Sequence, residues 1–249
     1  MEFLNKSKSR IYMLNTMAFI CFLLALILIA LLRVFRLDAF LEWYGRYNDT
    51  LLSYEIWMQT YGATWISVLS ILVNFALKAL IPWFPIPCLC VVSGVLFEWY
   101  HALLINIAGM IILFTIRFFW GRKFGGGNAE KILSKYDSAH NFIDSSKLGS
   151  NLLLFVLRFV PSVPVNSVSC LYGTTNISYF KYVIISVLGF TYKLFSYTLI
   201  GRNVFDPASA SFIVPFIILL IFSGMVLLTL SGAFEIGRLT TKYKKKGWL

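Results

Sequence analysis

The sequence predicts an all-α integral membrane protein. We expect an inverted repeat of two re-entrant helical hairpins, each followed by a transmembrane helix, with one more transmembrane helix at each end of the chain. Composition is the first observation behind this prediction. Of the 249 residues, 59% are hydrophobic and only 13% are charged, which is too apolar for a soluble domain. Runs of about 20 apolar residues near both ends are long enough to cross a bilayer.

The second observation is a repeat of prolines and glycines. Three of them recur 79 residues further along: Pro82, Pro85 and Gly94 return as Pro161, Pro164 and Gly173. Three more positions recur at an offset of 80: Gly109, Gly121 and Arg122 return as Gly189, Gly201 and Arg202. Because Pro and Gly control the backbone more than other residues, a shared pattern predicts a shared chain path. In an apolar chain, a repeat of broken helices is typical of the substrate site of a transporter.

The first elements are a transmembrane helix at residues 13–32 and an interfacial segment at residues 37–60. We expect this helix to be retained rather than cleaved as a signal peptide, because its apolar core is about twice the usual length and no small-residue cleavage site follows. The interfacial segment carries aromatic residues on one side of a helix: Trp43, Tyr47, Tyr54, Trp57 and Tyr61. This aromatic face either meets lipid or packs on protein, and both alternatives stay open.

The two repeats are expected at residues 61–120 and 151–202. The second begins with about 10 residues of helix, roughly 15 Å, which is half of a ~30 Å hydrocarbon core. A proline then interrupts the helix, and lipid cannot satisfy the carbonyl that it frees. The chain is therefore expected to enter halfway, turn at residues 161–164 and leave on the same side, and residues 82–85 make the equivalent turn. Residues 61–81 are also long enough to span fully, which would invert everything after them.

The remaining segments are a cytoplasmic amphipathic linker at residues 121–150, a C-terminal transmembrane helix at 211–233 and a basic tail at 234–249. The linker carries a one-sided apolar stripe: Ile132, Tyr136, Ala139 and Ile143. Lys and Arg number three before the first span, five in the linker and five in the tail, against three in residues 33–60 and one in 201–210. The positive-inside rule therefore predicts cytoplasmic N- and C-termini.

Composition also disfavours several functional classes. The net charge of +11 is gathered beside apolar runs, so membrane lipids and an anionic lipid head group, rather than nucleic acid, are the expected partners. The four cysteines lie in apolar segments without a His or carboxylate to complete a metal site: Cys21, Cys88, Cys90 and Cys170. We expect no metal, no cofactor and no enzymatic activity, because no nucleophile–base pair is recognisable. Short loops favour a bacterial plasma membrane, and a homo-oligomer stays an open alternative.

Basic residues inside apolar stretches are the candidates for substrate binding. A charge near the bilayer centre costs at least ~2.5 kcal/mol, so such residues mark function. Arg158 is the strongest, because it precedes the hairpin turn and an arginine holds phosphate bidentately without losing its proton. Asn166 begins the returning half-helix, whose N-terminus favours an anion, although a simple helix cap explains it equally well. Lys78 and Lys193 either line the same site or have structural roles.

The acid in these stretches is Glu98, which ends the first hairpin. It either pairs with a basic residue of the other repeat or lies at the membrane interface, and we favour the interface. Arg117 and Lys181 are expected to extend to the head groups. The resulting excess of buried positive charge predicts an anionic visitor, and our hypothesis is a lipid phosphate.

The run from Arg158 to Asn166, Arg-Phe-Val-Pro-Ser-Val-Pro-Val-Asn, and the Gly173 that follows it resemble the motif of the DedA/SNARE-associated Golgi protein superfamily, the VTT-domain proteins. The run Pro85-x-Pro87 through Phe97 and the Gly121-Arg122 helix end fit as well, and the details resemble the Tvp-type branch most. The resemblance covers about residues 60–200. It implies facing re-entrant hairpins, movement of lipid between leaflets and, at Arg158, the hairpin arginine on which the family depends.

The chain departs from DedA proper at three positions. Cys88 stands where DedA has an acid, Pro164 stands where it has a second arginine, and Glu98 stands where the family usually has Gly. The proton coupling proposed for DedA therefore does not carry over on these residues.

We expect a transporter or scramblase that moves a phosphate-bearing lipid, polyprenyl phosphate or phospholipid, between leaflets. One alternative is a proton-coupled or small-anion transporter whose buried basic site holds an inorganic anion. Another is a non-catalytic membrane scaffold whose basic tail and linker recruit partners.

Overall fold

The computed structural model of the chain describes residues 2–35, 38–81, 85–124, 147–159 and 163–245, and every regular element in these ranges is an α helix. The helices are α1 (Glu2–Val34), α2 (Asp38–Gly62), α3 (Trp65–Leu80), α4 (Ile86–Leu96), α5 (Trp99–Phe124), α8 (Lys147–Phe159), α9 (Val165–Gly173), α10 (Tyr179–Arg202) and α11 (Ala210–Lys245). Within these ranges, four stretches are long and apolar enough to cross a membrane: Ile11–Val34, Trp99–Phe124, Tyr179–Arg202 and Ala210–Thr229. For the described residues, the prediction of an all-helical chain with several helices able to cross a membrane is confirmed.

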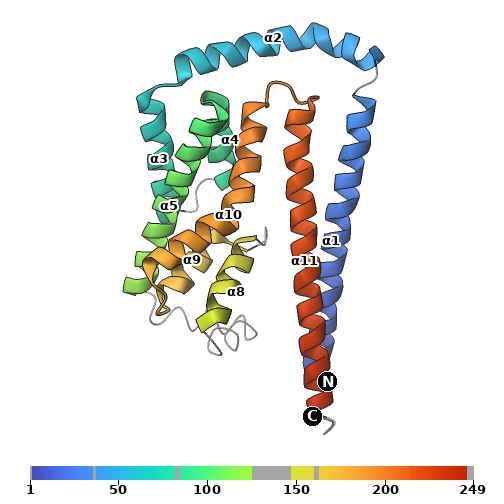
Figure 1. Cartoon of the computed structure of the whole chain (residues 1–249), viewed down its shortest axis with the longest axis vertical. Coiled ribbons are helices and arrows are strands. Elements are labelled where there is room, and N and C mark those ends of the chain that lie inside the picture. The colour runs from blue at the N-terminus through green and yellow to red at the C-terminus, as the bar shows by residue number, and fades with distance from the viewer. Residues whose placement is uncertain (1, 36–37, 82–84, 125–146, 160–162, 246–249) are drawn as a thin grey trace.

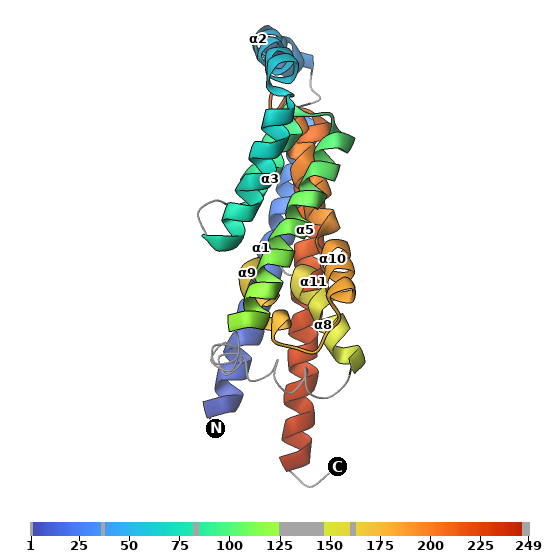
Figure 2. The same cartoon turned by 90° about the vertical axis from the view of Figure 1, so that its left-hand side faces the viewer.

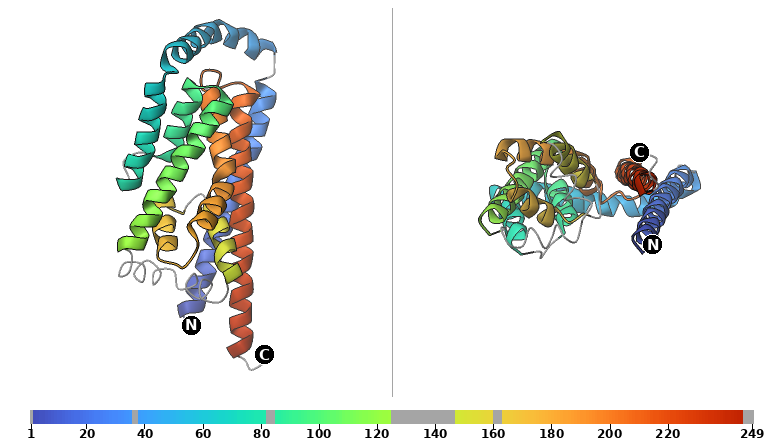
Figure 3. Two further views of the ribbon diagram at one scale, coloured as in Figure 1. Left: turned by 60° about the vertical axis from the view of Figure 1, so that its left-hand side comes forward. Right: turned by 90° about the horizontal axis from the view of Figure 1, so that it is seen from below.

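The helices form two groups (Figure 1). Short and long helices of the middle of the chain, α3 to α10, pack into one bundle, whereas α1 and α11 run side by side as a long pair. Seen along the molecule, this pair stands to one side of the bundle (Figure 3), and α10 contacts α11 to join the two groups. The N- and C-terminal ends lie at the same end of the molecule, and α2 crosses the opposite end.

The two outer helices are longer than the apolar runs predicted at residues 13–32 and 211–233. α1 has 33 residues and α11 has 36, about 50 Å each at 1.5 Å per residue, whereas a hydrocarbon core is ~30 Å thick. A helix satisfies its own backbone hydrogen bonds in water as well as in lipid, so it need not stop where hydrophobicity does. α11 therefore continues into the predicted basic tail as far as Lys245.

α2 occupies the predicted interfacial segment and is tied to the end of α10 and the loop that follows it. Arg202 Nη1 lies 3.1 Å from Glu55 Oε1, and Tyr44 donates a 2.9 Å hydrogen bond to Asp206 Oδ1. Burial and this hydrogen bond raise the pKa of the Tyr44 hydroxyl. The aromatic side chains of α2 at Tyr54 and Trp57 are exposed, so this part of the aromatic face does not pack on the rest of the chain.

α3 and α4 contact each other, and α3 also packs along α5 (Figure 2). α3 has 16 residues and meets the end of α2 at a bend of 90°. α8 and α9, of 13 and 9 residues, also contact each other. α4 and α9 each begin directly after a proline, Pro85 before α4 and Pro164 before α9, with φ near −70° in both. Pro82 and Pro161, the other predicted turn residues, and the predicted apolar stripe at residues 132–143 lie outside the described residues.

Glycines of the repeat meet one another at two helix crossings. Where α4 crosses α10, a Cβ placed on Gly94 would lie 3.1 Å from the Cα of Gly201. Where α9 crosses α5, a Cβ placed on Gly173 would lie 3.1 Å from the Cα of Gly121. Both distances are below ordinary van der Waals contact, so only glycine allows the backbones to approach this closely. The short helices α4 and α9 are thereby packed against the long helices α10 and α5, respectively.

The bundle has one apolar core with a polar seam through it. Large side chains such as Phe75, Phe114 and Phe118 are fully buried there. The seam is centred on Asn106 of α5, which accepts a 2.8 Å hydrogen bond from Ser93 Oγ and donates a 2.9 Å bond to Thr198 Oγ1. Because buried polar groups cost free energy unless they are paired, these bonds fix how α4, α5 and α10 pack together.

Candidate functional site

Arg158 lies in the last turn of α8 and is buried, with only 1% of its surface exposed. Its guanidinium makes four hydrogen bonds to side chains and backbone of two other helices, α9 and α10. Nε donates to Ser186 Oγ at 3.2 Å, Nη1 to the Val165 carbonyl at 3.1 Å, and Nη2 to Ser169 Oγ and Tyr182 Oη at 2.9 Å each. The side chain thus ties α8 to α9 and α10.

All four hydrogen-bond partners of Arg158 are neutral. Its Cζ atom also lies 4.3 Å from the centre of the Phe114 ring and 5.7 Å from that of Tyr182, so the negative faces of these rings add some stabilisation. Throughout the described part of the chain, no carboxylate pairs with this guanidinium. The positive charge is therefore hydrogen-bonded but not neutralised.

Lys193 of α10 lies directly behind Arg158. Its ammonium donates a 2.7 Å hydrogen bond to the backbone carbonyl of Arg158, and it too is buried. A cation at the last carbonyls of a helix is favoured by the helix dipole. Gly189, one turn earlier on α10, allows the close approach, because a Cβ there would lie 2.7 Å from the Cβ of Arg158. The structure thus brings together Arg158 and Lys193, two of the predicted site residues.

Asn166 and Lys78 meet each other beside this pair. Asn166, in the first turn of α9, donates a 3.3 Å hydrogen bond from Nδ2 to the carbonyl of Lys78 in the last turn of α3. Arg117 of α5 donates to the next carbonyl but one, that of Leu80, at 3.2 Å. Arg117, which was expected to extend to the head groups, has its Nε buried, and its Nη2 bonds to the end of α3. The C-terminal end of α3 is therefore in contact with the first turn of α9.

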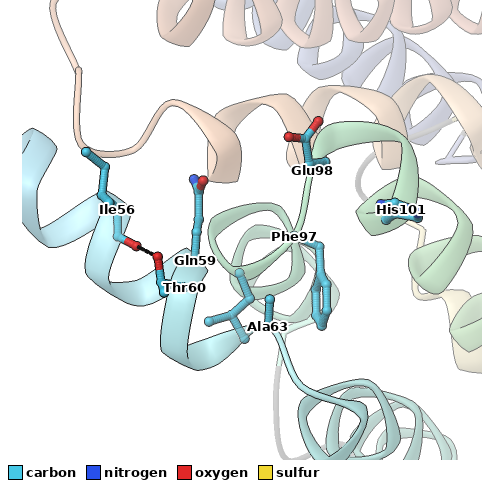
Figure 4. A pocket seen from close by; sticks show the side chains of 8 residues that line it. Ile56, Gln59, Thr60, Ala63, Phe97, Glu98 and His101 are labelled. Atoms are coloured by element: carbon cyan, nitrogen blue, oxygen red, sulfur yellow. Dashed lines mark hydrogen bonds between the residues drawn. The ribbon is translucent and has the colours of Figure 1, made fainter.

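Glu98, the remaining predicted site residue, lies apart from Arg158, Lys193, Asn166 and Lys78. It is exposed and lies in the turn between α4 and α5, near α2, whereas α8 lies toward the opposite end of the bundle. There it lines a cavity of about 330 Å³ between α2 and the α4–α5 turn (Figure 4). The other residues that line this cavity are Ile56, Gln59, Thr60, Ala63, Leu96, Phe97 and His101.

Three partners of Arg158 were not among the predicted site residues: Ser169, Tyr182 and Ser186. Serine and tyrosine are ordinary residues of an apolar helix, so neither type alone attracts notice. The signal that could have found two of them is spacing, since Tyr182, Ser186, Gly189 and Lys193 follow one another at intervals of 4, 3 and 4 residues. These intervals place all four on one face of α10.

Arg158 and Lys193, with Asn166 and Lys78 beside them, offer cations and hydrogen-bond donors, which are ligands for an oxyanion. The described residues contain no group of three His, Cys, Asp or Glu that could hold a metal ion. Free cysteines include Cys88 and Cys90 of α4 and Cys170 of α9, with Cys90 buried. The chemistry that the described residues support is therefore the binding of a negatively charged group.

Comparison with known proteins gives one match. The family model of the VTT domain matches residues 84–203, which include α4 to α10. This domain is that of the DedA/SNARE-associated Golgi superfamily, whose members are generally membrane proteins thought to be transporters or flippases. No curated protein and no solved structure matches the chain significantly.

Proposed function

Because residues 84–203 carry a VTT domain, we propose that the protein is a transporter or scramblase that moves a phosphate-bearing lipid between the two leaflets of the membrane. The lipid is a polyprenyl phosphate or a phospholipid. The observation that carries this proposal is the buried guanidinium of Arg158, which is surrounded by neutral partners. We also propose that the protein belongs to the Tvp-type branch of this superfamily, and this proposal rests only on the sequence motif around Arg158.

The charge of Arg158 supports an anionic substrate. Leaving an ion in an apolar interior without a counter-ion costs several kcal/mol, even when it is hydrogen-bonded. A lipid phosphate that reaches the guanidinium would neutralise its charge and could accept two parallel hydrogen bonds from its coplanar N–H groups. The acyl or prenyl tail of the same molecule would stay in the bilayer, so only the head group would need a polar path.

The arrangement of the two hairpins supports transport rather than simple binding. We propose that α3–α4 and α8–α9 are re-entrant hairpins related as an inverted repeat. In support, α8 and α9 are about 20 Å and about 14 Å long at 1.5 Å per residue, so neither crosses a ~30 Å core alone. The reciprocal glycine crossings, α4 on α10 and α9 on α5, further support a twofold relation between the repeats. In such folds the substrate binds where the repeats meet, and one repeat moves against the other.

The proposal also requires a movement. With 1% of its surface exposed, Arg158 is closed to a head group in this conformation. The α8–α9 hairpin carries Arg158 and two of its partners, so displacement of this hairpin from α10 would break the bonds to Ser186 and Tyr182 and open the guanidinium. We take the observed conformation as the occluded state of the transport cycle.

We further propose that both termini face the cytoplasm of a bacterial cell. The two ends of the chain lie at the same end of the molecule, which is consistent with the charge asymmetry of the sequence. Labelling of single introduced cysteines in intact cells would test this. Protection of a cysteine placed near Lys8 together with labelling of one near Asp206 would support it, and the reverse pattern would exclude it.

Leaflet exchange in vesicles tests the proposal. Purified protein is reconstituted in phosphatidylcholine vesicles that contain fluorescent phosphatidylglycerol or polyprenyl phosphate, and the fraction open to an external quencher is followed in time. We expect exchange with the wild type and with Lys123→Gln, an exposed residue at the end of α5, and loss of exchange with Arg158→Gln. No exchange by the wild-type protein would refute lipid transport, and equal exchange by Arg158→Gln would refute the role of Arg158.

A further inference from the structure

A second polar cluster lies where the C-terminal end of α3 contacts the first turn of α9. Its members are Lys78 in the last turn of α3, Arg117 on α5 and Asn166 in the first turn of α9. Asn166 Nδ2 and Arg117 Nη2 donate to the carbonyls of Lys78 and Leu80, at 3.3 Å and 3.2 Å. The end of α3 is thus held by side chains of two other helices.

Two polar atoms of this cluster are buried without a hydrogen-bond partner among the described residues: Arg117 Nε and Asn166 Oδ1. An unpaired buried donor or acceptor is unfavourable, and more so when the group is charged. Exchanging the positions of Oδ1 and Nδ2 in the Asn166 amide would not satisfy the unpaired atom, because the nitrogen is needed to donate to the Lys78 carbonyl. A ligand that offers an acceptor to Arg117 would remove part of this deficit.

The cluster also carries two positive charges and no acid. The Lys78 ammonium is half-buried and makes no hydrogen bond or ion pair within the described ranges. It lies close enough to Arg117 for the two charges to repel each other. An anion near both cations would relieve this repulsion.

We propose that Lys78, Arg117 and Asn166 form a second anion site, distinct from Arg158, that takes a phosphate oxyanion. Phosphate offers several acceptor oxygens, so one group can face both cations. A protonated phosphate oxygen or a bound water would in addition donate to Asn166 Oδ1. Free phosphate and a lipid head group share this chemistry. That the lipid is the source rests on the proposed function, whereas the anion site itself does not.

The position of the second site relative to Arg158 suggests what it does. Adjacent residues of α9 serve the two sites, since the Val165 carbonyl accepts from Arg158 and the Asn166 side chain belongs to the second cluster. Lys78 is half-buried, whereas Arg158 is fully closed off. The Lys78–Arg117 cluster is therefore the more accessible of the two, and it would receive a head group before the α8–α9 hairpin opens.

Binding to the full-length protein tests this site in two arms. In the first, inorganic phosphate is titrated by calorimetry into protein in an uncharged detergent. In the second, binding of phosphatidic acid is measured in phosphatidylcholine nanodiscs by native mass spectrometry. We expect Lys78→Gln and Arg117→Gln each to weaken binding by about tenfold or more in at least one arm, since a charged hydrogen bond is worth about that much. The matched control, Lys123→Gln, removes an exposed charge of α5 and should change binding less than about twofold.

The outcomes separate the sources and the alternatives. A loss confined to phosphatidic acid assigns the site to a lipid head group, and a loss confined to inorganic phosphate assigns it to the free ion. No loss in either arm, or an equal loss with Lys123→Gln, would overturn the proposal. If Arg117→Gln does not fold, Lys78→Gln carries the test, because its ammonium bonds to no described residue. Absence of leaflet exchange by the wild type, with these binding differences intact, would refute the proposed function and leave the site standing.

Discussion

Replacing Gly121 by alanine tests the close helix crossings on which the arrangement of the repeats depends. A Cβ at this position would lie 2.7 Å from the Cα and 2.8 Å from the carbonyl carbon of Cys170, whereas ordinary contacts begin at 3.4 Å. The obstacle is backbone, so it cannot turn aside, and α5 and α9 must separate by about 1 Å. Overpacking of this kind costs about 3 kcal/mol at its upper end. The better helix propensity of alanine returns about 1 kcal/mol, which leaves a net loss of about 2 kcal/mol.

Thermal unfolding in detergent measures this loss. At about 2–4 °C per kcal/mol for a chain of this size, Gly121→Ala should lower the unfolding temperature by about 4–8 °C. Gly201→Ala, at the equivalent crossing of α10 with α4, should behave alike, since a Cβ there would lie 2.9 Å from the Cα of Val91. The control is Gly232→Ala on α11, where nothing lies within 4 Å, so the same change should be neutral or slightly stabilising. An unfolding temperature of Gly121→Ala equal to that of Gly232→Ala would refute the reasoning.

Three further substitutions address single interactions. Arg158→Lys keeps the charge but cannot make the four hydrogen bonds of the guanidinium, so we expect a loss of about 3 kcal/mol in thermal unfolding and leaflet exchange below about a tenth of wild type; exchange at the wild-type rate would contradict this. Thr198→Val removes the 2.9 Å bond from the Asn106 amide and leaves its nitrogen only the longer 3.4 Å bond to the Cys90 carbonyl, so it should cost about 1–3 kcal/mol in the same unfolding assay; an unchanged unfolding temperature would show that the seam does not stabilise the fold. Glu55→Gln weakens a partly exposed ion pair to Arg202, so its effect should stay below about 1 kcal/mol, and a larger loss would mean that α2 is held mainly by this contact.

Much of the fold could be predicted because prolines and glycines act locally. Pro85 and Pro164 each stand directly before a helix, and the repeated glycines lie at helix crossings, as their effect on the backbone requires. These residues do not show which helix packs against which other helix. The packing of α4 on α10 and of α9 on α5 depends on contacts between residues about 50 to 110 positions apart, and a single sequence does not show which of them meet.

Around Arg158, only the charged residues of the candidate site could be predicted from the sequence. A basic residue deep in an apolar stretch is visible in the sequence, so Arg158 and Lys193 could be selected before their surroundings were known. The neutral groups around Arg158 could not, since Ser169 and Ser186 resemble any other small polar residue of a membrane helix. The bond from Arg117 to the Leu80 carbonyl of α3 could not be predicted either, since it joins two helices whose packing a single sequence does not show.

The role of Arg158 is tested most directly by locating the head group of a bound lipid. The measurement is a structure of the wild-type protein in nanodiscs that contain the lipid it exchanges. We predict density for a phosphate within hydrogen-bond distance of the Arg158 guanidinium, in place of at least one bond to Ser186 or Tyr182. A head group bound elsewhere, with all four protein hydrogen bonds of Arg158 intact in protein that exchanges lipid, would contradict it.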